Sequence, residues 1–169
     1  MLKNPTANTN YILSEQILVG GYPMEDSLES DADELFDCNN ISSIIKTGRD
    51  IFINLTTLYE KNTYFNYSKY VPKIIEYEIT DHNVPNDIVS FKEFIKLIHD
   101  IIKNGKKVYI HCAGGHGRTG LVCCCLLKEM GYTTGEAFNI VKTWHSTRDN
   151  MPNYPSPENY IQDEFVRNY

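Results

Sequence analysis

The segment from His111 to Gly120, HCAGGHGRTG, places one cysteine and one arginine around a run of glycines. In a glycine-rich turn that leads into a helix, backbone N–H groups converge where the helix dipole adds partial positive charge. The same field favours the thiolate form of Cys112, which is the nucleophilic form of a cysteine. The segment therefore predicts a cysteine nucleophile at the floor of a site for a tetrahedral oxyanion such as phosphate.

Neighbouring groups in this segment can hold the anion and assist the sulfur. Arg118 offers a planar fork of N–H donors that matches two phosphate oxygens. Thr119 can donate a hydrogen bond to the thiolate and ease its departure as leaving group, although a hydroxyl at this position can also serve only as a helix cap. The predicted phosphate-binding residues are Ala113, Gly114, Gly115, His116, Gly117 and Arg118.

The flanking residues predict the elements that position this loop. The apolar residues 108–110 indicate a buried strand, and 121–127 are too apolar for a surface loop and indicate a buried helix. A zinc site is disfavoured, because the histidines and cysteines lack two separated ligand pairs and adjacent residues on a strand or helix point in different directions. We expect no metal and no cofactor.

His111 and Cys112, followed after five residues by Arg118-Thr119-Gly120, resemble the signature loop of the cysteine-dependent protein tyrosine and dual-specificity phosphatases. The resemblance implies a hydrolase with a phosphate-binding loop (P-loop), a phosphocysteine intermediate and a phosphorylated protein substrate. It also implies the single-domain α/β fold of that family. The competing interpretation is a buried structural cysteine beside an ordinary glycine turn.

Phosphate ester hydrolysis also needs an acid that protonates the leaving oxygen, on a loop able to close over the substrate. Asp81 lies one predicted helix and one predicted strand before Cys112, and residues 81–85 (DHNVP) resemble the acid loop of the lipid phosphatase named phosphatase and tensin homologue. We predict that Asp81 is the acid, with Asp87 as the alternative, while either could simply cap a turn. His82 could orient Asp81, contact phosphate or be solvated.

The C-terminal residues 156–166 resemble the Ser-Pro-Glu-Thr-x-x-Gln segment of small soluble tyrosine-phosphatase-like proteins. This resemblance implies that Gln162 positions the water that cleaves the intermediate; the alternative is an ordinary surface glutamine. Residues 8–11, 18–23 and 54–56 resemble other segments of the same group, so the likeness extends over most of the chain.

Length, composition and charge limit the classes of protein to which this chain can belong. A chain of 169 residues, with 41% hydrophobic and 22% charged residues, predicts one globular domain, 1–169. A net charge of −6 argues against a nucleic-acid partner and weakens docking on anionic membranes. Five cysteines, three of them consecutive, do not suggest a disulfide framework. With neither a signal peptide nor a membrane segment evident, we expect a cytoplasmic protein.

The hydrophobic pattern predicts strands alternating with helices. Strands are expected at 11–14 and 16–19, which suggest an opening hairpin, and at 73–79 and 108–110. Residues 41–45 and 51–55 are strands or apolar runs flanked by turns, and 56–69 are expected to form a loop. Helices are expected at 28–36, 91–102, 121–127, 134–144 and from 156–158 onward, with a capping box at 90–93 for the helix 91–102. This predicts an α/β fold whose central mixed sheet of about four to five strands is flanked by helices on both faces, with the site outside the carboxyl ends of the strands.

The charge of the signature loop limits the class of substrate. The phosphoinositide enzymes whose acid loops resemble residues 81–85 carry lysines in the signature loop where this chain has Ala113 and His116. A phosphoprotein is therefore favoured over a polyphosphorylated headgroup. The short chain is also expected to lack the recognition loop that deepens the pocket in larger tyrosine-specific relatives, which leaves dual specificity open. The alternatives are a phosphoinositide or RNA 5′-phosphatase and a non-catalytic phosphate-binding module. Cys38 and Cys123–Cys125 match no resolving cysteine and are expected in the core, with a redox role as the alternative.

Overall fold

A computed structural model of the chain describes residues 2–26 and 39–169, which surround a five-stranded sheet of order β1-β2-β5-β3-β4. The strands are β1 (Thr9–Ile12), β2 (Ser14–Gly20), β3 (Ile51–Asn54), β4 (Ile74–Glu76) and β5 (Val108–His111). β1 and β2 form an antiparallel hairpin, and the other neighbouring pairs are parallel. The predicted opening hairpin and mixed sheet are confirmed.

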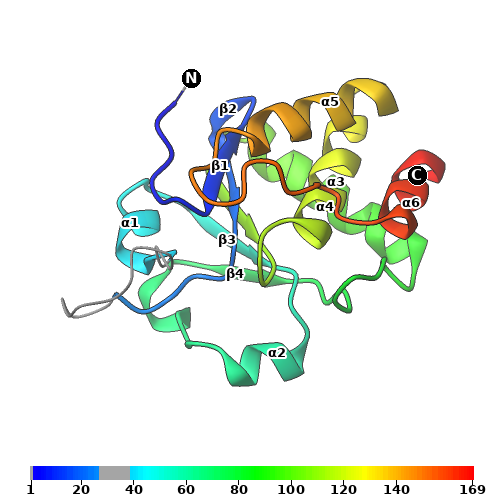
Figure 1. Cartoon of the computed structure of the whole chain (residues 1–169). Helices are drawn as coiled ribbons and strands as arrows, with labels where there is room; N and C mark the ends of the chain where they lie inside the picture. The colour runs from blue at the N-terminus through cyan, green and yellow to red at the C-terminus, as the bar shows by residue number, and fades with distance from the viewer. Residues whose placement is uncertain (1, 27–38) are drawn as a thin grey trace.

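Helices cover both faces of this sheet (Figure 1), as the sequence predicts. They are α1 (Ile41–Ile45), α2 (Leu58–Thr63), the 3₁₀ turn η1 (Ser68–Tyr70), α3 (Ile88–Lys103), α4 (Gly117–Glu129), α5 (Thr134–His145) and α6 (Tyr160–Asn168). Helices α3 to α6 pack on one face and α1 packs on the other. None of the helices in the described ranges is both long and apolar enough to cross a membrane.

The central strand β5 shows how the two cores are divided. All four of its residues are buried, as expected for a strand covered on both faces. Val108 and Ile110 join the core beneath α3 to α6, and Tyr109 joins the aromatic core on the opposite face. Because β2, β3 and β5 are parallel, their carboxyl ends meet where β5 delivers Cys112.

The structure differs from the sequence prediction in two regions between β2 and β4. Residues 41–45 form the short helix α1 rather than a strand or an apolar run flanked by turns, with Ile41 and Ile44 buried. Part of the expected loop 56–69 is helix α2, whose first turn is closed by a capping box between Thr57 and Glu60. A helix as short as α1 packs on the sheet through only two buried residues. Its apolar pattern is therefore too short to be distinguished from that of a strand.

Two helix starts also differ. Helix α3 is capped by Asp87, whose Oδ1 accepts hydrogen bonds from the N–H groups of Val89 and Ser90, so the capping box expected at 90–93 is wrong. Helix α6 begins at Tyr160 behind the cap Asn159 instead of at 156–158. In both cases another side chain reaches the free N–H groups of the first turn. The helix predicted at 28–36 and Cys38 lie outside the described residues.

Candidate active site

Cys112 directly follows β5 and is almost fully buried, but its sulfur is not surrounded by apolar groups alone. Its Sγ accepts hydrogen bonds from the backbone N–H of Gly115 and from Thr119 Oγ1, each at 3.2 Å. Hydrogen bonds to the charged form of a group favour that form. Two hydrogen-bond donors therefore face the sulfur at the base of the loop that precedes α4.

Residues 112–118, called the phosphate loop below, are held from outside through their carbonyl groups. The N–H of Tyr22 donates to the carbonyl of Ala113 at 2.8 Å, and Ser156 Oγ donates to that of His116 at 2.9 Å. Gly115 has a φ of +79°, and a Cβ there would overlap the backbone of Gly20 and Gly21. With carbonyls engaged on the outside, N–H groups remain for the interior of the loop, as anion binding requires.

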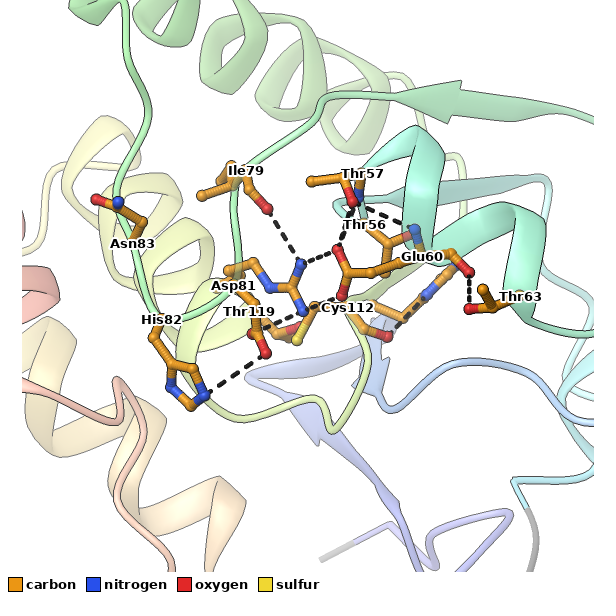
Figure 2. A network of polar contacts seen from close by, with 12 residues as sticks. Thr56, Thr57, Glu60, Thr63, Ile79, Asp81, His82, Asn83, Cys112 and Thr119 are labelled. Carbon is orange, nitrogen blue, oxygen red and sulfur yellow. Dashed lines mark hydrogen bonds and ion pairs between the residues drawn. The ribbon is translucent and has the colours of Figure 1, made fainter.

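The Arg118 guanidinium is almost fully buried and is held by polar groups from two other segments. Nη1 and Nη2 donate to Glu60 Oε2 and Oε1, each at 2.8 Å, and Nη1 also donates to the Ile79 carbonyl at 3.1 Å. Nη2 lies 2.8 Å from Asp81 Oδ1. Figure 2 shows Glu60, Asp81 and the Ile79 carbonyl converging on this network beside Cys112. Burial alone would lower the Arg118 pKa, but the hydrogen bonds to Glu60 and the nearby negative charges raise it.

Glu60 is a functional candidate that sequence reasoning missed. Its Oε2 also accepts the backbone N–H of Thr57 at 2.9 Å, so one carboxylate caps α2 and orients Arg118. Burial would raise the Glu60 pKa, but the hydrogen bonds from Arg118 and Thr57 lower it below its usual value. The Thr57-x-x-Glu60 pattern was a visible capping signal, but nothing local connects it with an arginine 58 residues away.

The structure places Asp81 beside Arg118 and uses Asp87 as the cap of α3. Asp81 is half exposed, and its Oδ2 lies 3.5 Å from His82 Nε2, while His82 Nδ1 lies 3.2 Å from Glu158 Oε1. One ligand atom from each of Asp81, His82 and Glu158 lies within 4.8 Å of the others. The imidazole faces the two carboxylates with different nitrogens, so His82 bridges Asp81 and Glu158.

Gln162 is fully buried, which excludes the alternative of a surface glutamine. Its Oε1 accepts the backbone N–H of Glu158 at 3.1 Å, and its Nε2 donates to the carbonyl of Asn83 at 3.3 Å. Asn159 Nδ2 donates to the carbonyl of His82 at 2.9 Å. The side chain of Gln162 thus ties the loop 80–85, called the acid loop below, to the C-terminal segment, and its role in positioning water stays a prediction.

The remaining histidines and cysteines at the end of β5, in the phosphate loop and on α4 add no charge to the site at neutral pH. Burial lowers the pKa of both His111 and His116 to about 3, so both imidazoles are neutral. Cys123, Cys124 and Cys125 are buried in the core, as expected. Burial raises the pKa of Cys123 to about 12, so this thiol stays protonated. Among these groups, the phosphate loop therefore owes its positive side-chain charge to Arg118.

Comparison with known proteins agrees with this geometry. Residues 35–156 match the family model of the dual specificity phosphatase catalytic domain. A protein of Invertebrate iridescent virus 3 classed as a tyrosine phosphatase is 29% identical over 168 residues, which cover 95% of this chain and 64% of the relative. The Dictyostelium discoideum phosphatidylinositol 3,4,5-trisphosphate 3-phosphatase and dual-specificity protein phosphatase is 29% identical over 58% of this chain and 16% of its own length.

Among solved structures, the human tyrosine phosphatase-like serine/threonine/tyrosine-interacting protein superposes with a TM-score of 0.70 at 18% identity, covering 95% of this chain and 94% of that one. This likeness shows a shared fold. The chain spans less than two thirds of the length of either sequence relative above. Because the family model spans most of the chain, including Cys112 and Arg118, the chain belongs to the dual specificity phosphatase family.

Proposed function

We propose that this chain is a metal-independent phosphatase that removes phosphate from phosphotyrosine in proteins, with phosphoserine and phosphothreonine as further candidate substrates. The observation that carries the proposal is the pair of hydrogen bonds from Gly115 N–H and Thr119 Oγ1 to Cys112 Sγ, at the mouth of a glycine loop that also carries the buried Arg118. This arrangement stabilises a sulfur anion beside donors suited to a phosphoryl group.

In the first step, the Cys112 thiolate attacks phosphorus, so that an S–P bond forms while the bond to the leaving oxygen breaks. Asp81 transfers its proton to that oxygen. In the second step, water attacks the phosphorus of the phosphocysteine while Asp81 accepts a proton from that water. The S–P bond breaks, which releases inorganic phosphate and restores the thiolate. Throughout, Arg118 and the N–H groups of the phosphate loop hold the non-bridging oxygens.

The contacts of Arg118 suggest how phosphate binding and acid catalysis are linked. Its Nη1–Nη2 edge is occupied by Glu60, while Nε is buried and has no hydrogen-bond partner among the described residues. The Nε–Nη2 edge is therefore the one available to phosphate, although Asp81 Oδ1 lies on Nη2. A phosphate oxygen that takes this edge replaces Asp81 at Nη2, and this frees the carboxyl group to approach the leaving oxygen.

The charge of the site favours esters that carry a single phosphate. Arg118 is shared with two carboxylates, and the neutral His111 and His116 add no cation for a second phosphate. A pocket of about 360 Å³ is lined by Tyr22, which bonds the phosphate loop, by further tyrosines and asparagines, and by Lys61, whose charge is paired with Glu76. Such a lining suits the polar and aromatic groups of a peptide better than a polyphosphorylated headgroup.

The decisive experiment is turnover of an aryl phosphate by the wild-type chain in the presence of a metal chelator. We expect turnover that Cys112→Ser abolishes, because the less acidic hydroxyl provides no comparable nucleophile in this site. Substantial activity in that variant would refute the nucleophile, and no turnover by the folded wild type would favour a phosphate-binding module.

Substrate class is then decided by a panel of phosphotyrosine peptide, phosphothreonine peptide, phosphoinositide and triphosphorylated RNA. We expect the phosphotyrosine peptide to give the highest kcat/KM. The phosphoinositide is a necessary member of the panel, since the Dictyostelium relative is named for a lipid substrate. A phosphoinositide that is turned over faster than both peptides would replace the protein substrate.

A further inference from the structure

A buried arginine that has no part in the mechanism above lies against the outside of the phosphate loop. Arg148 follows α5 and is only 3% exposed. Its Nη2 donates to the carbonyl of Gly115 at 2.9 Å, and its Nε donates to Asn10 Oδ1 at 2.6 Å. Gly115 donates its own N–H to Cys112 Sγ. One residue of the loop is thus bonded to the nucleophile on one side and to Arg148 on the other.

Arg148 is a cation without a carboxylate partner in the described part of the chain. Burial lowers the pKa of Arg148 to about 10, so the guanidinium is still charged at neutral pH. Among the described residues its Nη1 also has no hydrogen-bond partner. A buried charge left without an opposite charge destabilises the folded state. An anion nearby would offset this cost.

The titratable groups whose charges act on Arg148 include Tyr109, Cys112 and Cys123. Burial raises the pKa of Tyr109 and of Cys123 far above neutrality, so neither is negative in the folded protein. On the same side, burial and the charge of Arg148 lower the pKa of His116 to about 3 and that of His145 to about 4, so both are neutral. Among these described groups, Cys112 is the one left whose anion would offset the charge of Arg148.

Arg118 cannot fully supply the charge that a thiolate needs. It faces the carboxylates of both Glu60 and Asp81, so these three groups together carry a net negative charge when Asp81 is ionised. The groups that face Cys112 from other elements are Arg118 on α4, Tyr64 after α2, Tyr109 on β5, Cys123 on α4 and Arg148 after α5. Arg148 is the cation in this set that no carboxylate of the described residues neutralises.

We propose that Arg148 is a positioning residue for the nucleophile: it anchors the carbonyl of Gly115, the residue whose N–H faces the sulfur, and it contributes positive charge from behind the loop that favours the thiolate. The inference rests on the proposed function insofar as Cys112 is the nucleophile. It adds a second cation to the one that the signature loop itself carries.

The test measures the Cys112 thiolate directly, through its rate of alkylation by iodoacetamide as a function of pH, with Cys112→Ser as the blank. In Arg148→Met we expect the pH midpoint of alkylation to rise by about one unit, because a nearby opposite charge is lost. The kcat/KM for an aryl phosphate falls as well, and falls most on the acid side of the profile. Arg148→Lys keeps the charge but loses the planar fork of donors. We therefore expect its alkylation midpoint to return most of the way to the wild-type value, while its kcat recovers less.

Asn10→Asp tests the effect of the Arg148 charge while leaving Arg148 itself in place. The new carboxylate keeps an acceptor for Nε and neutralises the guanidinium, so the midpoint rises as in Arg148→Met. This variant decides the question if Arg148→Met does not fold. Folded variants that lower the Tm but keep the wild-type midpoint would show that Arg148 only supports packing, and would overturn the inference. A wild-type chain that alkylates normally without hydrolysing phosphate esters would instead refute the proposed function alone.

Discussion

The phosphate loop and the acid loop lie side by side at Arg118, but they are held in opposite ways. The phosphate loop is buried and bonded from outside by Tyr22, Arg148 and Ser156. In the acid loop, the side chains of Asp81 and His82 are 50% and 68% exposed. That loop is held by Arg118 and by side chains at the beginning of α6.

This difference corresponds to two chemical tasks. Donors that stabilise developing charge work best when their positions are set before the reaction, since no free energy is then spent on reorientation. An acid that must approach the leaving oxygen after the substrate has entered needs a segment that can move. We therefore expect changes in the phosphate loop to affect all substrates, and changes in the acid loop to depend on the leaving group.

The largest effect that separates the two loops is expected for Asp81→Asn. Loss of a general acid costs about 10²- to 10⁴-fold in kcat for alkyl or weakly acidic phenol leaving groups, and far less for strongly acidic phenols. The measurement is kcat across a series of aryl phosphates. Asp87→Asn is the matched control, because Asp87 caps α3; we expect it to keep its kcat. A loss in Asp81→Asn that is equal for all leaving groups would show that Asp81 acts through Arg118 and not as the acid.

An intermediate effect is expected for Glu60→Gln, which breaks the two-point grip on Arg118. The amide keeps one acceptor but loses the charge, and we expect kcat/KM to fall about tenfold for every leaving group, equivalent to about 1.4 kcal/mol. Glu136→Gln is the control, since Glu136 forms the same capping box with Thr133 at the exposed start of α5. Equal losses of activity in the two variants would mean that the cap, and not the arginine, is responsible.

The smallest effect is expected for Asn159→Ser, which keeps an oxygen to cap α6 but removes the amide that donates to the His82 carbonyl. We expect the Tm to change little and kcat to fall by a few-fold for weakly acidic leaving groups only. The comparison is again kcat across leaving groups, beside a thermal unfolding curve. An unchanged kcat across the whole series would show that the acid loop does not depend on this contact.

Several features could be read from the sequence because they arise within short segments. The strand β5, the glycine turn and helix α4 are contiguous, so apolar residues, glycines and a cysteine in order are enough to predict them. The amphipathic helix α3 and the helix α5 follow from local spacing for the same reason. Helices α1 and α2 were missed because they are only five and six residues long.

The sequence by itself determined the α/β class, the loop around Cys112 and Arg118, and Asp81 as the favoured acid. Only the tertiary structure decided that Glu60 grips Arg118, that Gln162 and Asn159 hold the acid loop, and that Arg148 bonds Gly115. The physical reason is separation along the chain. Turns and helices form from hydrogen bonds between near neighbours, whereas these contacts join residues 33 to 79 positions apart, which meet only after the sheet has brought its strand ends together.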